Sequence, residues 1–279
     1  MKHPKVEHAK VLFVSQEITP YLPESEMSKI GRYLPQGIQE KGREIRTFMP
    51  KFGCINERRN QLHEVIRLSG MNLIIDDTDH PLIIKVASIQ SARMQVYFID
   101  NEDYFHRKHV LKNSKGEYFQ DNDERVIFFA RGVLETVRKL RWSPDIVHCH
   151  GWITSLVPLY LRKAYQDDPL YNRSRIIYSV YNDEFDQPLE ARFKDKLMME
   201  GIEKEDVSIL EKPTFENLTK IALQMSDATI LGSKDINKKI VDYIKTINKP
   251  VLEYKSEEDY IEAYSEFYDE LLTKPIDEN

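Results

Sequence analysis

The sequence predicts an α/β fold built on a doubly wound, mostly parallel sheet. Short apolar, β-branched runs alternate with segments of helical periodicity, and the chain opens with a strand–helix–strand unit, which favours a right-handed parallel crossover. The chain has 279 residues, of which 41% are hydrophobic, enough for one large core. We therefore predict a single Rossmann-like domain over residues 1–279, in which residues 250–279 form a C-terminal capping strand and helix.

The first half of the chain supplies the opening unit. Residues 10–18 form an apolar run typical of a buried strand. Residues 25–41 carry apolar side chains at helical spacing, Gly42 is a stop signal, and residues 44–50 form a second strand. An antiparallel excursion, or an edge of the same sheet, is expected from the strand-like runs at 62–77, 80–90 and 92–100.

The second half continues the alternation after a polar segment, 101–123, which we expect to be a long surface loop. A strong helix is predicted over 123–140, with N-cap candidates at 121–123. The elements expected after it are strands at 145–150, 175–181, 228–233 and 250–254, helices at 154–164, 214–225, 234–246 and 257–272, and a looser region at 182–212.

In such folds, ligands lie beyond the carboxyl ends of the parallel strands. This rule gives candidate site segments before any motif is considered. They are residues 15–19, 148–152, 181–183 and 232–233.

Composition narrows the class of protein. The formal net charge is −6 and no basic stripe is present, so we do not expect a nucleic-acid partner. Two cysteines, Cys54 and Cys149, are too few for a disulfide framework and suit a reducing compartment. Residues 1–10 lack the apolar core of a signal peptide, and no apolar run approaches the ~20 residues of a membrane span. We expect a cytoplasmic protein without a membrane partner.

The usual cofactor motifs are absent. Residues 15–26, which follow the first strand, contain no glycine, so the dinucleotide-binding G-x-G-x-x-G is missing there. The chain also has no P-loop and no G-x-S-x-G elbow. We therefore expect no cofactor.

The sequence His-Cys-His-Gly-Trp at 148–152 is the main candidate for chemistry. On a strand, His148 and His150 point to one face and Cys149 to the other. A zinc site needs a third and a fourth ligand, and the remaining histidines are scattered, so we predict no metal. A metal-dependent enzyme using His148 and His150 is an alternative. Cys149 is flanked by apolar residues, which favours a buried thiol over a nucleophile.

Several segments together resemble the bacterial glycogen synthase and plant starch synthase family. The most specific are "VYFIDNEDYFHR" (96–107) and "GEYFQDNDERVIFFARGVLE" (116–135). The others are "KVLFVSQEITPYLPESE" (10–26), "YLPQGIQEKGREIRTFMPKFG" (33–53), "DIVHCHGWITSLVPLYLR" (145–162), "IIYSVYNDEF" (176–185) and "NLTKIALQMSDATILGSKDINKKI" (217–240).

The resemblance implies one half of a GT-B glycosyltransferase, an enzyme that transfers glucose from ADP-glucose to an α-1,4-glucan. In that family the active site lies between two domains, and the second domain supplies most nucleotide contacts. The chain ends about where the second domain should begin.

Several family positions are replaced in this sequence. The family follows its first strand with Lys-Thr-Gly-Gly-Leu, whose lysine and glycines line the phosphates, whereas residues 22–26 read Leu-Pro-Glu-Ser-Glu. In the His-Asp-Trp-His segment, the family aspartate falls on Gly151 and the last histidine on Ile153. The histidine of the Thr-Val-His-Asn segment falls on Tyr181, while Asn182 is kept. We therefore assign no catalytic residue.

The leading hypothesis is a relative that is impaired or inactive alone and binds an α-glucan or a protein partner. The alternative is an active glycosyltransferase, binding an ADP-glucose-type ligand, that is completed by a protein partner supplying the second domain. Candidate substrate-binding residues are His150, Trp152, Tyr181, Asn182 and Tyr104. The aromatic side chains expected to stack on sugar faces are Tyr21, Tyr104, Phe105, Trp152, Tyr181 and Phe185.

Overall fold

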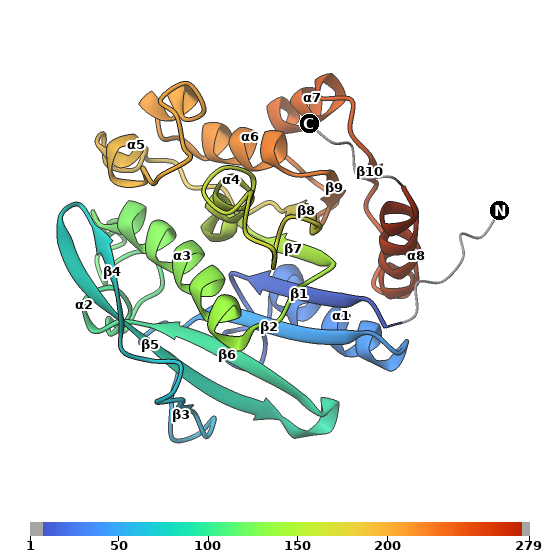
Figure 1. Ribbon diagram of the computed structural model, residues 1–279, viewed down its shortest axis with the longest axis horizontal. Coiled ribbons are helices and arrows are strands. Elements are labelled where there is room, and N and C mark those ends of the chain that lie inside the picture. Colours follow the sequence, from blue (N-terminus) through green and yellow to red (C-terminus); the bar gives the residue numbers. More distant parts are fainter. Residues whose placement is uncertain (1–7, 275–279) are drawn as a thin grey trace.

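A computed structural model describes residues 8–274 of the chain and shows a mixed sheet with helices on both faces (Figure 1). The strands are β1 (Lys10–Ser15), β2 (Glu44–Pro50), β3 (His63–Glu64), β4 (Met71–Ile75), β5 (Thr78–Ile89), β6 (Met94–Asp100), β7 (Ile146–His150), β8 (Arg175–Val180), β9 (Ala228–Leu231) and β10 (Val251–Leu252). The α-helices are α1 (Glu26–Glu40), α2 (Glu102–Phe105), α3 (Asn122–Leu140), α4 (Leu156–Arg162), α5 (Phe193–Lys196), α6 (Phe215–Met225), α7 (Lys238–Thr246) and α8 (Tyr260–Thr273).

The strand order is β10-β9-β8-β7-β1-β2-β6-β5-β3, with β4 paired to β5. All pairs from β10 to β6 are parallel, and the pairs made by β5 are antiparallel. The predicted fold class, including the antiparallel excursion, is confirmed. The order reverses at β1, which lies between β2 and β7, so the carboxyl ends of β1 and β7 flank the position where doubly wound sheets bind ligands.

Local sequence explains why α1 starts where it does. The Ser25 hydroxyl accepts a hydrogen bond from the Ser28 amide at 3.0 Å, and the Ser28 hydroxyl accepts one from the Ser25 amide at 2.8 Å. This reciprocal cap satisfies two amide groups at the helix start. Apolar side chains at helical spacing then turn toward the sheet: Met27, Ile30, Leu34 and Ile38 are all buried.

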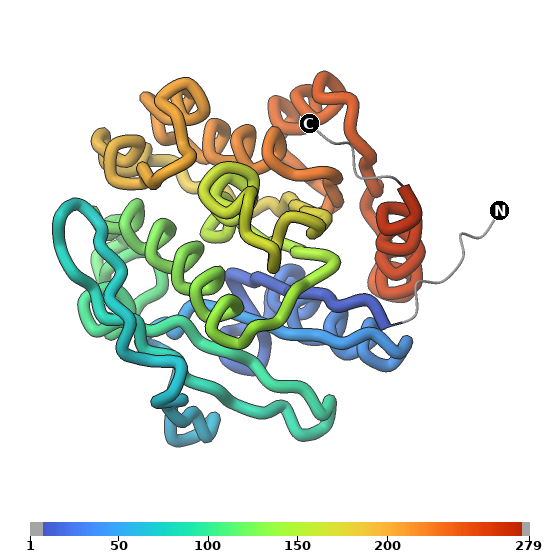
Figure 2. Tube along the Cα trace, in the orientation of Figure 1, coloured from blue at the N-terminus to red at the C-terminus, as the bar shows by residue number. Residues whose placement is uncertain are grey.

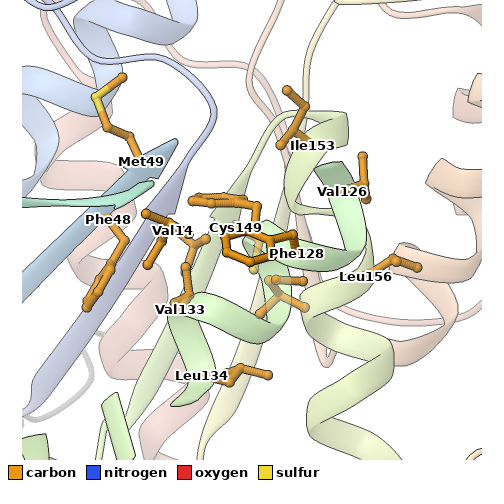
Figure 3. Close-up of a cluster of buried hydrophobic side chains, with 14 of the residues drawn as sticks. Val14, Phe48, Met49, Val126, Phe128, Val133, Leu134, Cys149, Ile153 and Leu156 are labelled. Carbon is orange, nitrogen blue, oxygen red and sulfur yellow. The ribbon is translucent and has the colours of Figure 1, made fainter. Parts of the chain in front are cut away.

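The two faces of the sheet carry separate cores. Helices α3, α4 and α6 pack on one face, where Cys149 and Val14 from the strands meet Phe128, Val133 and other side chains of α3 (Figure 3). On the other face, α1 and α8 pack over Phe13 and Ile146. Because strand side chains alternate, His148 and His150 point to the α1–α8 face, opposite Cys149, as the two-residue spacing predicts.

Several element boundaries differ from the sequence-based expectations. The first strand ends at Ser15 rather than residue 18, and the last helix begins at Tyr260 rather than 257. The expected 154–164 helix is split into a 3₁₀ turn (Trp152–Thr154) and α4. The loop at 101–123 contains the short helix α2. Asp121 is the N-cap of α3 but makes no side-chain cap, because its carboxylate accepts hydrogen bonds from Arg107 at 2.6 and 2.8 Å.

Within residues 8–274, no helix is both long enough and apolar enough to span a membrane.

Candidate functional site

A polar hollow of about 570 Å³ lies at the carboxyl ends of β1, β8 and β9. Its volume is in the range of small-molecule sites. Three of the four segments predicted from the strand ends contribute to it. The lining residues are Glu17, Ser25, Glu26, Met27, Tyr181, Asn182, Asp183, Ser233, Lys234 and Asp235.

Carboxylates dominate the charge of this hollow. Glu17, Glu26, Asp183 and Asp235 face the single ammonium group of Lys234. Two of the carboxylates are fixed by hydroxyl groups. Glu17 accepts a hydrogen bond from the Ser25 hydroxyl at 2.7 Å, and Glu26 accepts one from the Ser233 hydroxyl at 2.6 Å. The hollow is therefore an acceptor-rich, negatively charged surface.

Asp183 is the carboxylate held most deeply in the hollow. It is partly buried, and its Oδ2 accepts a hydrogen bond from the Trp152 amide at 3.1 Å. Burial, together with the nearby charges of Glu17 and Glu184, raises the pKa of Asp183 to about 7. This group therefore changes charge near neutral pH.

The two histidines are buried behind the hollow and are engaged by hydroxyl groups. His148 Nδ1 lies 2.6 Å from the Tyr268 hydroxyl, and its Nε2 lies 2.7 Å from the Ser179 hydroxyl. His150 Nδ1 lies 2.7 Å from the Tyr181 hydroxyl. Burial lowers the pKa of His150 to about 3 and that of His148 well below its usual range, so both imidazoles are neutral at pH 7.

The metal and nucleophile alternatives gain no support from this geometry. No group of three or more His, Cys, Asp or Glu side chains in the described part of the chain could hold a metal ion. Both ring nitrogens of His148 already have hydroxyl partners. Burial raises the pKa of the Cys149 thiol, which keeps it protonated at neutral pH.

Gly151, which follows β7, has no room for a side chain. Its φ is +85°, a conformation that L residues rarely adopt. A Cβ atom there would lie 2.8 Å from Met27 Sδ and 2.9 Å from Gln16 Oε1. Gln16 is itself fixed, because its Oε1 accepts a hydrogen bond from the Ile153 amide at 3.1 Å. Met27, a lining residue of the hollow, thus fills the space beside position 151.

Comparison with known proteins identifies the relatives of this fold and site. A family profile described as "Starch synthase catalytic domain" matches residues 10–248. The chain belongs to this family. It is 37% identical over 194 residues to the glycogen synthase of Chlorobium luteolum, covering 69% of this chain and 40% of that protein. It is 39% identical over 174 residues to the glycogen synthase of Chlorobium limicola, covering 62% of this chain and 36% of that protein.

A solved structure shares the fold. It is the catalytic domain of starch synthase IV from Arabidopsis thaliana bound to ADP and acarbose, with a TM-score of 0.72 and 18% sequence identity. The match covers 88% of this chain and 51% of that one. The chain is therefore similar in sequence to the starch synthase catalytic domain and similar in fold to a solved member, and it spans about 40% of the length of the glycogen synthases it matches.

Of the five candidate substrate-binding residues, two lie in the lining of the hollow and three do not. Tyr181 and Asn182 line the hollow. His150 and Trp152 are 1% exposed and lie behind it, where Trp152 packs on Phe185 with ring centroids 4.6 Å apart. Tyr104 is remote from the lining: its hydroxyl donates to Glu124 at 2.8 Å and it is 2% exposed.

The aromatic side chains that the sequence suggested for stacking on sugars are buried. A sugar face can stack only on a ring that solvent reaches. The six aromatic residues named from the sequence are at most 8% exposed: Tyr21, Tyr104, Phe105, Trp152, Tyr181 and Phe185.

Sequence reasoning missed other lining residues of the site. Lys234 and Asp235 directly follow the strand end at 232–233, so extending that segment by two residues would have found them. Met27 was assigned only to the apolar face of the first helix, and nothing in its spacing indicates that it borders the site.

Proposed function

We propose that this starch synthase-family domain binds a neutral α-glucan in the polar hollow and is impaired in, or lacks, glucose transfer from ADP-glucose on its own. The observation that carries the proposal is the balance of charge in the hollow, where the carboxylates of Glu17, Glu26 and Asp235 and the partly ionised Asp183 lie against one ammonium group. Two of these carboxylates, Glu17 and Glu26, are fixed by serine hydroxyls.

The start of α1 offers few free backbone amides that could donate hydrogen bonds to the diphosphate of a nucleotide sugar. Helix N-termini bind phosphate through free backbone amides and a positive dipole end. Here the Ser28 amide is already capped by Ser25, and Glu26 stands in the first helical turn. At 4 Å, two like charges repel by about 4 kcal/mol in the effective dielectric of a protein surface. The family's lysine and glycines fall within 22–26, where this chain has Leu-Pro-Glu-Ser-Glu.

A neutral glucan suits the same carboxylate-rich surface, because its hydroxyl groups can donate hydrogen bonds to the carboxylates without charge repulsion. Sugar hydroxyl groups are neutral donors, and carboxylate oxygens are strong acceptors. Asn182 adds an exposed amide that can both donate and accept. A neutral ligand also avoids the electrostatic repulsion that a nucleotide sugar meets.

The test is calorimetric titration of the full chain with maltohexaose and, separately, with ADP-glucose. We expect saturable heat with maltohexaose and none with ADP-glucose. Asn182→Ala should weaken maltohexaose binding by about 2- to 10-fold, the effect of one hydrogen bond. Asn72→Ala, at an exposed position of β4 outside the hollow, is the matched control and should leave the affinity unchanged. Absence of glucan binding would overturn the proposal.

A transferase completed by another protein segment is the second candidate. It is favoured by the family match, since the starch synthase catalytic-domain profile covers residues 10–248. The same titration separates the two candidates. Saturable binding of ADP-glucose, followed by glucose transfer to maltohexaose when a partner is added, would establish this second function.

A further inference from the structure

A second cavity of about 380 Å³ borders the polar hollow. The two share Ser25 and Glu26 at the start of α1, so they lie next to each other. The far wall of this cavity is formed by Tyr254, Lys255, Glu257 and Tyr260. Figure 2 shows this part of the chain passing from α7 to α8 along one side of the molecule.

The far wall comes from a segment outside the family match. The starch synthase profile ends at residue 248, and the wall residues begin at Tyr254. Helix α8 packs on α1 and thereby brings this segment against the first turn of α1. This second cavity is therefore a feature of the C-terminal segment of this chain.

Tyr254 is partly exposed to solvent, whereas the six aromatic residues named from the sequence are buried. It is 37% exposed, so solvent reaches part of its ring, and partial burial and, after it, the nearby carboxylate of Glu26 raise the pKa of its hydroxyl. Ile30 and the buried Tyr260 add apolar surface to the same cavity. A cavity that combines apolar side chains, a partly exposed aromatic ring and charged or polar groups suits a sugar ring, which has apolar C–H faces and hydroxyl edges.

The charges of the second cavity also favour a neutral ligand. Glu24, Glu26 and Glu257 outnumber Lys29 and Lys255. Lys29 Nζ lies 4.0 Å from Glu24 and 3.8 Å from Glu257, so its charge is already balanced by two carboxylates. Anionic ligands therefore gain little here.

We propose that the second cavity is an additional sugar subsite, in which Tyr254 stacks on a glucose unit of an oligosaccharide that extends from the hollow past Glu26. This inference rests on the proposed glucan binding and adds that affinity grows with chain length until the oligosaccharide reaches Tyr254. Shorter ligands occupy the hollow alone.

Calorimetric titration of the full chain with maltose, maltotriose and maltohexaose tests the subsite. Wild type should bind maltohexaose about 2- to 10-fold more tightly than maltose, the gain from one aromatic contact. Tyr254→Ala should abolish this gain and leave maltose affinity unchanged, while Tyr254→Phe, which keeps the ring, should retain most of it. Tyr33→Ala removes an exposed tyrosine of α1 that lines neither cavity and should behave as wild type.

The outcomes separate this inference from the proposed function. If wild type binds all three glucans and Tyr254→Ala keeps the full dependence on chain length, the subsite is refuted while glucan binding stands. If wild type binds none of the glucans, both ideas are refuted. Since Tyr254 is partly exposed, its loss should leave the thermal unfolding midpoint within about 2 °C of wild type, which shows that the variant is folded.

Discussion

Gly151 shows how one residue shapes the site. Its φ of +85° turns the chain out of β7, and Met27 Sδ occupies the space that a Cβ atom would need. The neighbouring Trp152 amide is thereby aimed at Asp183, and the Ile153 amide at Gln16. The absence of a side chain at position 151 thus allows α1 to pack against the end of β7 through Met27.

We expect Gly151→Ala to destabilise the protein by about 2 to 4 kcal/mol, because backbone strain and a clash with Met27 add. Urea-induced unfolding measures this difference in free energy. Gly116→Ala is the matched control: its φ is +82°, but nothing lies within 4 Å of the added Cβ atom. Gly116→Ala should lower the free energy of unfolding by about 1 kcal/mol, the effect of backbone strain at positive φ alone. Equal losses for the two variants would show that contact with Met27 is unimportant.

Asp183 gives a prediction about pH. Its pKa is raised from 3.8 to about 7 in the folded protein, so the folded state binds more protons than the unfolded state between these values. The stability of wild type relative to Asp183→Asn should therefore be greatest near pH 4 and fall as pH rises through 7, by at most ~1.4 kcal/mol per pH unit. Urea unfolding of both proteins at pH 5, 6, 7 and 8 measures the trend. Parallel pH curves would contradict it.

At the scale of elements, α8 is fastened to the sheet by buried polar contacts. Arg43, just before β2, lies with its Nη2 2.6 Å from Asp269 Oδ1, and both side chains are at most 7% exposed. Tyr268 of the same helix reaches His148 on β7. These contacts hold α8 on the sheet beside α1, and α8 in turn positions the segment that forms the second cavity.

Removing one partner of this ion pair should be costly, since it leaves a buried charge uncompensated. Asp269→Ala is expected to lower the free energy of unfolding by about 3 to 5 kcal/mol, measured by urea denaturation. The double variant Arg43→Met, Asp269→Leu removes both charges and should recover most of that loss. Were the double variant as unstable as the single one, packing rather than charge would account for the effect.

At the scale of the whole molecule, sheet topology fixes where the hollow lies, and the distribution of charge limits which ligands it attracts. Because β1, β7, β8 and β9 run parallel, the segments that follow them, near residues 17, 151, 183 and 234, lie at one end of the sheet although they are far apart in sequence. The overall charge of −6 agrees in sign with that of the hollow. Long-range attraction therefore favours neither a nucleotide sugar nor any other anion.

Glucan binding should be insensitive to ionic strength for this reason. Raising salt from about 50 to 300 mM shortens the screening length of charges but leaves a neutral ligand unaffected. We expect the dissociation constant for maltohexaose to change by less than about twofold across this range, measured by calorimetry. A tenfold loss of affinity at high salt would indicate that charge attraction drives binding.

The sequence by itself determined the fold class, the order of most elements and the family. Hydrophobic periodicity and strand–helix alternation are local, so they can be recognised in segments such as 10–18 and 123–140 without knowledge of their neighbours. The rule that ligands lie at the carboxyl ends of strands also named Tyr181, Asn182 and Ser233, and the structure shows that these three residues line one hollow.

Only the tertiary structure decided which side chains solvent can reach and how charge is distributed around the site. Burial arises from contacts between distant segments, so no local pattern could reveal that Trp152 and Tyr104 are enclosed or that Tyr254 is open. Likewise, the meeting of Glu17, Glu26 and Asp183 depends on how β1, α1 and β8 pack. The exact helix ends depend on such contacts as well, because Arg107 takes the Asp121 carboxylate that was expected to cap α3.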